Sequence, residues 1–163
     1  MDAHLRLLTP DDEAFLWQAL YHALHVAPGE VPFPPEVVRQ PEIARYVAGW
    51  MRRPGDAGFI AEAEGEPIGA AWLRQWTTAE HGFGFVDEAV PELSMALLPA
   101  YRGRGAGTLL LEHAARHVDA VSLSVSASNP ARRLYERLGF LVVEEAEGGS
   151  VTMLKSFLAG EAP

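Results

Sequence analysis

A glycine-rich turn that carries two arginines is the feature of this sequence best suited to chemistry. It reads Arg102-Gly103-Arg104-Gly105-Ala106-Gly107-Thr108, and it joins a strand-like segment to an apolar segment with helical spacing. A helix N-terminus presents free backbone N–H groups and the positive end of its dipole. Glycine lets that backbone approach a phosphate closely, and arginine adds positive charge. The turn therefore predicts a site for a phosphate or pyrophosphate group.

Two common nucleotide-binding loops do not fit this turn. A Walker A loop requires the pair Lys-Ser or Lys-Thr after its last glycine, and no such pair follows Gly107. A dinucleotide fingerprint requires a third glycine where Thr108 stands. It also requires an acid at the end of the next strand, which closes instead with Ser124-Val125-Ser126. Both interpretations fail on these residues.

The pattern that does fit is R-x-x-G-x-G, over Arg102 to Gly107. A second motif follows downstream, where Asn129 to Phe140 reads NPARRLYERLGF and matches N-x-A-x-x-x-Y-x-x-x-G-F. In this order the two motifs resemble the acetyl-CoA-binding region of the GNAT superfamily of N-acetyltransferases. The resemblance implies acetyl transfer from acetyl-CoA to a primary amine. Since the chain has no cysteine to carry an acyl group, direct attack in a ternary complex is expected.

The resemblance also implies where acetyl-CoA would lie. The strand before the turn would separate from its neighbour and offer backbone groups to the pantetheine arm, while the amides of the turn would hold the pyrophosphate. Asn129 would meet the pantetheine or the acetyl end. The residues assigned to acetyl-CoA binding are Met95, Ala96, Leu97, Leu98, Arg102, Gly103, Arg104, Gly105, Ala106, Gly107, Thr108, Asn129 and Arg132.

Two residues are candidates for proton transfer. By the resemblance, Tyr135 would lie near the sulfur and protonate the departing thiolate, which suits a phenol with a pKa of about 10. Glu92 opens the strand that family members often use for the base, so it is the first candidate to take the proton of the amine. Asp87, Glu88 and His81 are alternatives, and an acceptor that arrives deprotonated needs no base.

Each of these residues also has a purely structural interpretation. Tyr135 could only pack its ring on the sheet, Asn129 could only cap the helix that follows it, and Glu92 could be a solvated strand end. For the whole protein, the alternatives are a protein N-terminal acetyltransferase, a non-catalytic acyl-CoA sensor, or a binder of another nucleotide phosphate. The acceptor is expected to be a small amine, an amino acid or an antibiotic.

The resemblance assigns the acceptor pocket to the first two helices and their proline-rich connection. The aromatic residues in this sequence are mostly expected in the core, but some of four should line that pocket: Tyr21, Phe33, Trp72 and Trp76. His113 and His117 have the spacing of metal ligands on a helix, but the sequence shows no third ligand and lacks the glutamate of H-E-x-x-H. No metal is therefore expected.

The elements that must position these residues give one mixed α/β domain over residues 1–163. A GNAT-like fold implies a mostly antiparallel, twisted sheet of about seven strands with helices on both faces. A V-shaped opening is expected between the strands over residues 92–98 and 120–126. The expected strands are 4–8, 58–64, 67–77, 92–98, 120–126, 140–143 and 151–157, and the expected helices are 10–26, 41–53, 105–117 and 129–138.

Composition narrows the partners of the protein. The chain has 163 residues, 48% of them hydrophobic, and a net charge of −9, which argues against nucleic acid as a partner. Within residues 102–137, however, six arginines face three acids, so the acidic surroundings contain a local basic segment. No targeting signal and no run of roughly 18 apolar residues is evident, so a cytoplasmic protein without membrane contact is expected. Family members are often dimers, which makes a homodimer an expectation from the resemblance alone.

Overall fold

The computed structural model describes residues 2–116 and 118–156, and its helices and strands follow the expected order. His117 and Phe157, which the sequence analysis assigns to the ends of a helix and a strand, lie outside the described residues. The strands are β1 His4–Leu7, β2 Ala57–Ala63, β3 Glu66–Arg74, β4 Glu92–Leu97, β5 Ala120–Ser126, β6 Leu141–Glu145 and β7 Ser150–Ser156. The helices are α1 Glu13–Ala23, α2 Pro41–Ala44, α3 Ala106–Ala115 and α4 Ala131–Arg137.

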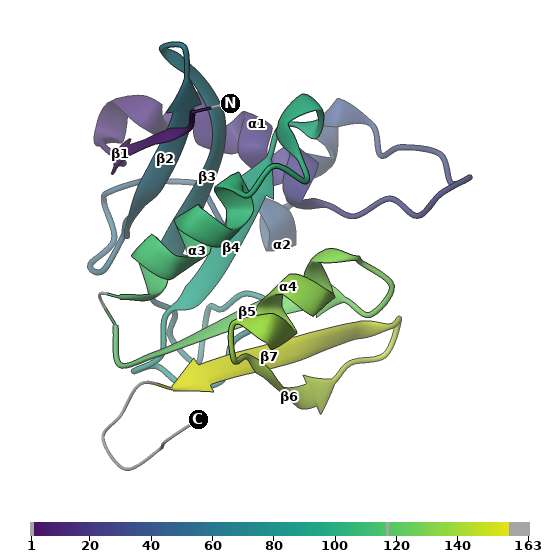
Figure 1. Ribbon diagram of the computed structural model, residues 1–163. Coiled ribbons are helices and arrows are strands. Elements are labelled where there is room, and N and C mark those ends of the chain that lie inside the picture. Colours follow the sequence, from purple (N-terminus) through teal and green to yellow (C-terminus); the bar gives the residue numbers. More distant parts are fainter. Residues whose placement is uncertain (1, 117, 157–163) are drawn as a thin grey trace.

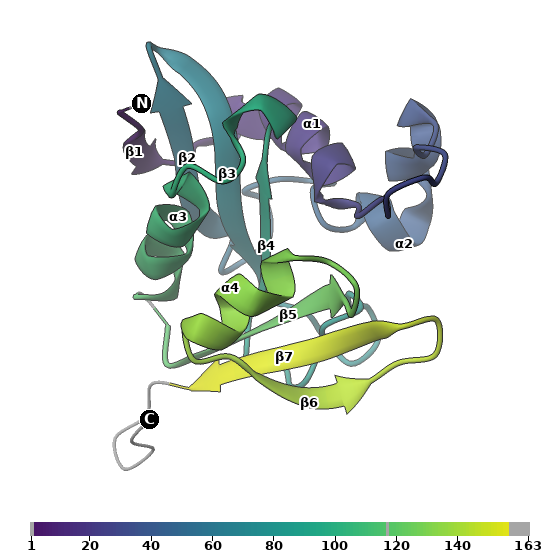
Figure 2. The same cartoon turned by 45° about the vertical axis from the view of Figure 1, so that its right-hand side comes forward.

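The seven strands form one sheet in the order β1-β2-β3-β4-β5-β7-β6. Every neighbouring pair is antiparallel except β4 and β5, which are parallel and share register only at Glu92 and Ser122. Beyond that point the two strands diverge, as Figures 1 and 2 show. The structure therefore confirms the expected mixed fold, with its mostly antiparallel sheet and its separated central pair.

Helices cover both faces of the sheet, and each face has its own apolar core. On one face α1 and the segment around α2 pack on the sheet through side chains that include Leu16, Trp50 and Trp72. On the other face α3 and α4 pack through side chains that include Leu110 and Phe140 (Figure 1). Because side chains alternate along β4, Glu92 belongs to the first face and Met95 to the second. No helix among the described residues is both long and apolar enough to cross a membrane.

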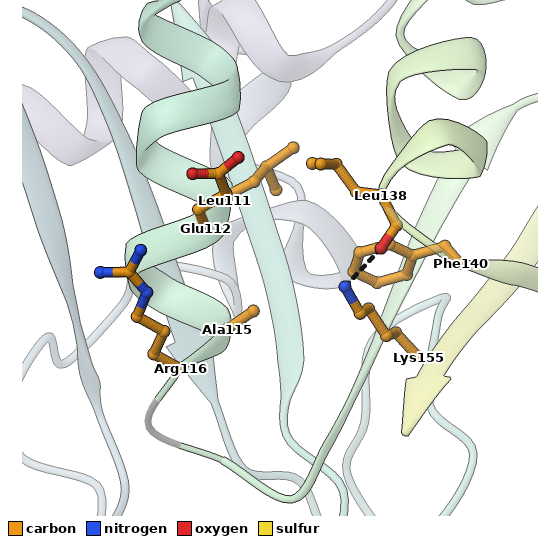
Figure 3. A pocket seen from close by; sticks show the side chains of 7 residues that line it. All are labelled: Leu111, Glu112, Ala115, Arg116, Leu138, Phe140 and Lys155. Carbon is orange, nitrogen blue, oxygen red and sulfur yellow. Dashed lines mark hydrogen bonds between the residues drawn. The ribbon is translucent and has the colours of Figure 1, made fainter. Parts of the chain in front are cut away.

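The C-terminal end of α4 is held by Lys155, the only lysine in the chain. Its ammonium donates to the carbonyl of Leu138, where a cation also suits the negative end of the helix dipole. These two residues line a small pocket of about 190 Å³ between α3 and α4 (Figure 3). Gly139, the glycine of the second motif, follows the helix in the left-handed region, at φ 97°, which agrees with a helix expected to end at residue 138. These contacts fix the helix that carries the motif tyrosine.

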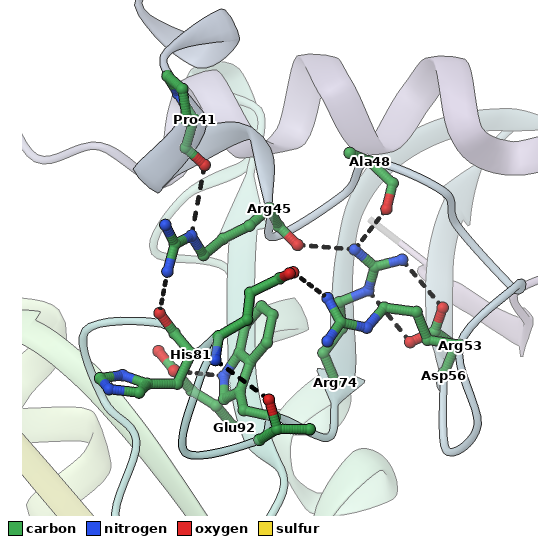
Figure 4. Close-up of polar contacts among 11 residues, drawn as sticks. Pro41, Arg45, Ala48, Arg53, Asp56, Arg74, His81 and Glu92 are labelled. Atoms are coloured by element: carbon green, nitrogen blue, oxygen red, sulfur yellow. Dashed lines mark hydrogen bonds and ion pairs between the residues drawn. The ribbon is translucent and has the colours of Figure 1, made fainter.

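The second helix is much shorter than the sequence predicts, because residues 45–53 form turns. The guanidinium of Arg74 on β3 donates to the carbonyls of Arg45 and Ala48, both at 2.7 Å (Figure 4). The indole of Trp72 donates to the carbonyl of Tyr46 at 2.9 Å. Carbonyls that are directed toward β3 do not accept the backbone hydrogen bonds of an α-helix. The predicted helix over 41–53 is therefore wrong beyond Ala44.

Candidate active site

The glycine-rich turn after β4 has the backbone that an anion site needs. Gly103 and Gly105 adopt φ values of 74° and 90°, in the left-handed region that favours glycine. A side chain added at either position would meet no heavy atom within 4 Å, so the space beside both residues is open. Gly105 caps α3, a helix of ten residues whose first-turn N–H groups have no intrahelical acceptor. These residues fit a ligand that carries a diphosphate.

Apolar side chains from three elements converge beside this turn. A Cβ placed on Gly107 of α3 would lie 3.5 Å from Met95 and 3.6 Å from Leu97, both on β4. Leu134 of α4 lies 3.7 Å from the same point. The start of α3, the end of β4 and α4 thus meet where β4 leaves β5. An apolar arm that continues from the phosphate site would follow this side of β4.

The two arginines of the turn have different surroundings. Arg102 donates to the carbonyl of His22 at 3.1 Å and to that of Leu97 at 3.4 Å, so it ties the turn to the end of α1. Burial and the charge of Arg102 lower the pKa of His22. The guanidinium of Arg104 lies 5.9 Å from the ring centre of Tyr101. The structure therefore gives Arg102 an anchoring contact that sequence reasoning did not predict.

Asn129 caps α4, because its side-chain oxygen accepts a hydrogen bond from the N–H of Ala131 at 2.9 Å. Arg132 lies 3.5 Å from Glu136 in the same helix, so part of its charge is already balanced. Asn129 and Arg132 both line a shallow pocket of about 480 Å³ at the start of α4. The sequence-predicted cap is present, and the pocket leaves room for a ligand beside it.

Tyr135 lies in the core between α4 and the sheet. Its ring meets that of Phe140 edge-on, with centres 5.8 Å apart. Burial raises the pKa of Tyr135 to about 12, so the phenol keeps its proton at neutral pH. Burial is the one cause of this shift, so no hydrogen bond from a described residue acts on the hydroxyl. The Tyr135 phenol thus carries a proton that no other described residue accepts.

Glu92 is a buried carboxylate with two donors. It is 3% exposed, although it opens a strand. The Tyr46 hydroxyl donates to its Oε2 at 2.7 Å, and the Trp76 indole donates to its Oε1 at 2.8 Å. Burial raises the pKa of Glu92 to about 7, while the hydrogen bonds from Tyr46 and Trp76 oppose that shift. A carboxyl group with this pKa can take and release a proton near neutral pH.

A loop between β3 and β4 encloses this carboxylate. A Cβ on Gly82 would lie 2.5 Å from the carboxylate of Glu92, and one on Gly84 would lie 2.7 Å from the backbone of Leu123. Only glycine fits such close approaches. The N–H of Phe83, between the two glycines, donates to the Tyr46 hydroxyl at 2.7 Å. The loop therefore shields Glu92 from bulk water.

The alternative bases lie on the surface of this region. Asp87 accepts a hydrogen bond from the N–H of Ala89, and Glu88 accepts one from the N–H of Thr78, each at 2.8 Å. His81 is exposed, and its ring stacks on that of Phe85 with centres 4.5 Å apart. Asp87 and Glu88 thus stabilise turns and His81 packs on Phe85, whereas the Glu92 carboxylate is enclosed.

The four aromatic residues expected at the acceptor pocket fall into two pairs. Trp76 contacts Glu92 directly, and the fully buried Trp72 supports Tyr46 from behind. Tyr21 donates its hydroxyl proton to the carbonyl of Phe33 at 2.6 Å, on the exposed segment that follows α1. The structure thus brings Trp76 to Glu92 and Trp72 to the backbone of Tyr46, while Tyr21 and Phe33 bind each other.

Sequence reasoning gave no site role to Tyr46, which contacts Glu92 across 46 residues of sequence. No local signal distinguishes it from a core aromatic residue.

His113, one of the two candidate metal ligands, places Nδ1 2.9 Å from the carbonyl of Leu109. Its partner in that hypothesis, His117, lies outside the described residues. Among the described residues no group of three His, Cys, Asp or Glu could hold a metal ion.

Replacing Gly105 by Ala should weaken CoA binding about tenfold, because the left-handed turn that exposes the amides would relax and one hydrogen bond to a charged group would be lost. The matched control is Gly29→Ala, since Gly29 has φ 87° and equally open surroundings. Both variants should lose about 1 kcal/mol of unfolding free energy. Isothermal titration calorimetry with CoA measures the affinity of each variant and so distinguishes the two. Equal CoA affinity in the two variants would contradict the site.

Known proteins share both the sequence pattern and the fold. The family model described as acetyltransferase (GNAT) family matches residues 17–140. The chain therefore belongs to the GNAT family of acetyltransferases, which confirms the resemblance seen in its motifs. No curated protein matches the sequence.

Solved acetyltransferase structures superimpose on the whole fold. YncA, a putative acetyltransferase from Salmonella typhimurium solved with acetyl-CoA, is 23% identical and covers 100% of this chain and 98% of its own, with a TM-score of 0.67. A phosphinothricin acetyltransferase from Sinorhizobium meliloti, solved with acetyl-CoA, is 20% identical over 96% and 89%, with a TM-score of 0.67. The ribosomal-protein-S18-alanine N-acetyltransferase from Escherichia coli is 21% identical over 98% and 97%, with a TM-score of 0.62. At these identities the likeness shows the fold.

Proposed function

We propose that the protein transfers an acetyl group from acetyl-CoA to a primary amine of a small molecule, such as a small amine, an amino acid or an antibiotic. One observation carries the proposal. A single strand, β4, has the enclosed Glu92 at its start and the glycine-rich turn just after its end. Six residues of strand span about 16 Å, a length comparable to an extended pantetheine arm. A base at the start of this strand and a phosphate site after its end would suit the length of this substrate.

The chain supplies binding groups along the whole length of that substrate. The amides at the start of α3, together with Arg104, would hold the pyrophosphate. Met95, Leu97 and Leu134 would contact the pantetheine arm where β4 leaves β5. Asn129 and Arg132 would border its path at the start of α4. Acetyl-CoA supplies a thioester, whose carbonyl carbon accepts the lone pair of the amine.

Two residues of this chain move the protons. The amine nitrogen forms the new C–N bond as the C–S bond breaks, and the electron pair of that bond leaves on sulfur. Glu92 takes the proton that the nitrogen loses, through an intervening water because the carboxylate is enclosed. Tyr135 gives its phenolic proton to the sulfur and regains one from solvent. The products are the N-acetylated amine and the free thiol of CoA.

Replacing Tyr135 by Phe tests this function. The variant keeps the ring contact with Phe140 and removes only the proton donor. We expect kcat to fall about 100-fold, while the affinity for CoA, measured by calorimetry, changes less than about twofold. Release of the CoA thiol in the presence of an acceptor is the measurement. Unchanged kcat would remove Tyr135 as the acid, and loss of CoA affinity would give it a binding role instead.

A further inference from the structure

We propose that Tyr46 is the positioning residue for Glu92, and that side chains of the neighbouring strand β3 hold Tyr46 in place for this purpose. The inference rests on the proposed function, because it concerns the carboxylate that takes the proton of the acceptor. Tyr46 itself would touch neither substrate. Its role is to fix the orientation of the carboxylate and the pH at which the carboxylate becomes a base.

The hydrogen bonds of the Tyr46 hydroxyl have only one consistent direction. The N–H of Phe83 donates to this hydroxyl at 2.7 Å, so the proton of the hydroxyl must point elsewhere. It points to Oε2 of Glu92, also at 2.7 Å. Burial and the nearby carboxylate raise the pKa of Tyr46 well above its usual range, so the donor keeps its proton. Tyr46 is therefore a permanent donor to Glu92.

The backbone that carries Tyr46 is fixed from β3. Trp72 donates to the carbonyl of Tyr46 itself, and Arg74 donates to the carbonyls of the residues at positions 45 and 48. The carboxylate of Asp56 holds the guanidinium of Arg74 through two hydrogen bonds, at 3.1 and 3.0 Å. In the sheet, Arg74 pairs in register with Glu92 on β4. The clamp and the base are thus built on adjacent positions of two paired strands.

Two further residues, Trp76 and Ser122, lie beside the Glu92 carboxylate. Trp76 donates to Oε1, and its ring meets that of Tyr46 edge-on with centres 5.4 Å apart. Ser122 pairs with Glu92 across β4 and β5, so both side chains belong to the same face of the sheet. The Ser122 hydroxyl is buried and has no hydrogen-bond partner among the described residues. In this proposal the unpaired Ser122 hydroxyl, on the same face of the sheet as Glu92, binds the water that carries the proton.

The sign of the effect follows from these contacts. The groups that face Glu92 are Tyr46, Trp76 and the backbone N–H of Gly84, which donate hydrogen bonds, and His81, whose positive form also favours the carboxylate. A hydrogen bond to the ionised form lowers the pKa of the acid that accepts it. Removing the Tyr46 hydroxyl should therefore raise the pKa of Glu92, so that the base is ionised only at higher pH.

The test compares wild-type protein with Tyr46→Phe. In the pH profile of kcat/KM we expect the acid limb of Tyr46→Phe to move about one pH unit upward, which lowers kcat/KM at pH 7 by about fivefold and leaves it nearly unchanged above pH 9. Trp76→Phe should move the limb in the same direction. The KM for acetyl-CoA should stay the same. A purely structural loss would lower the rate at every pH without moving the limb.

Two controls keep the outcomes distinct. Leu16→Ala damages the apolar core on the same face without touching Glu92, so its limb should stay in place despite lower stability. The C=O infrared band of protonated Glu92, assigned by its loss in Glu92→Gln, reports the pKa without any turnover. An active Tyr46→Phe variant whose limb and band titrate as in wild type would overturn the inference. Failure of the proposed function would appear differently, as absent turnover in the wild-type protein.

Discussion

Glu92→Gln should lower kcat/KM by 100-fold to 1,000-fold above pH 8 and abolish the acid limb near pH 7. The amide keeps the size of the side chain but cannot take a proton, and a positioned base contributes about this much to the rate. The limb is expected near 7 because burial raises the pKa of Glu92 to about that value. Initial rates of thiol release from pH 5.5 to 9.5, at saturating and limiting acceptor, measure both effects.

The same substitution should stabilise the fold at alkaline pH. The pKa of Glu92 is about 7 in the folded protein, against an ordinary value of 4.5. Below pH 4.5 the group is protonated in both states and costs nothing. Between pH 4.5 and 7 the unfolded chain has lost its proton while the folded protein retains it, so by pH 7 to 8 the folded state has lost up to about 3 kcal/mol. The amide accepts through one oxygen only, so one of the two donors, Tyr46 or Trp76, loses its acceptor, which offsets about 1 kcal/mol of the gain.

Glu92→Gln should therefore raise the unfolding free energy by about 2 kcal/mol at pH 8.5 and leave it unchanged or slightly lower at pH 4.5. Urea denaturation at the two pH values gives the comparison. Equal destabilisation at both would show that the carboxylate serves the fold and not the reaction. Gain of stability together with loss of activity is the pattern expected of a group kept for catalysis.

The second large effect concerns the ion pair that supports Tyr46. Asp56 and Arg74 are each 1% exposed in their side chains and lie 3.0 Å apart. Asp56→Asn leaves the buried guanidinium without its counter-charge, and breaking a buried pair in this way costs about 3–5 kcal/mol. We expect the unfolding free energy to fall by that amount. Urea denaturation at pH 7 measures it.

The matched control is the exposed ion pair between Arg53 and Glu80. Its N–O distance is 2.8 Å, but the Glu80 side chain is 57% exposed. Water and salt screen such a pair, so Glu80→Gln should cost less than about 1 kcal/mol. A similar loss in Asp56→Asn and Glu80→Gln would contradict the structural importance of the buried pair. It would also show that the pair of Asp56 and Arg74 does not support Tyr46.

Features that depend on neighbours in sequence were predictable. The turn at 103–107, the cap at Asn129 and the end of α4 at Gly139 follow from local backbone chemistry, and the structure places all three as expected. The mostly antiparallel sheet with its separated central pair followed from the resemblance to a known family. These elements form wherever short-range preferences agree with the tertiary packing.

Features that depend on distant side chains were not predictable. The helix expected over 41–53 fails because its carbonyls accept hydrogen bonds from Trp72 and Arg74, more than 25 residues away. Glu92 was identified as a candidate base, but its enclosure depends on Tyr46, Trp76 and the 81–85 loop. No pattern in the sequence predicts such contacts. They arise only when the chain has folded.

The local count of arginines overstates the number of guanidinium groups that are free to bind an anion. Six arginines in residues 102–137 suggest a strongly basic site. In the structure Arg102 binds carbonyls of α1 and β4, and Arg132 lies beside Glu136. Backbone amides at the start of α3 must therefore provide much of the binding for an anion. This explains why the glycines matter more than the charge count suggests.

The most direct test of the account is release of the CoA thiol from acetyl-CoA by the wild-type protein across a panel of primary amines. The panel should include small amines, amino acids, antibiotics and peptide N-termini. We predict that at least one acceptor gives free thiol and N-acetylated product in equal amounts, with kcat/KM rising through a pKa near 7. Tight binding of acetyl-CoA without thiol release for any amine would contradict the account and identify the protein as a binder of acyl-CoA.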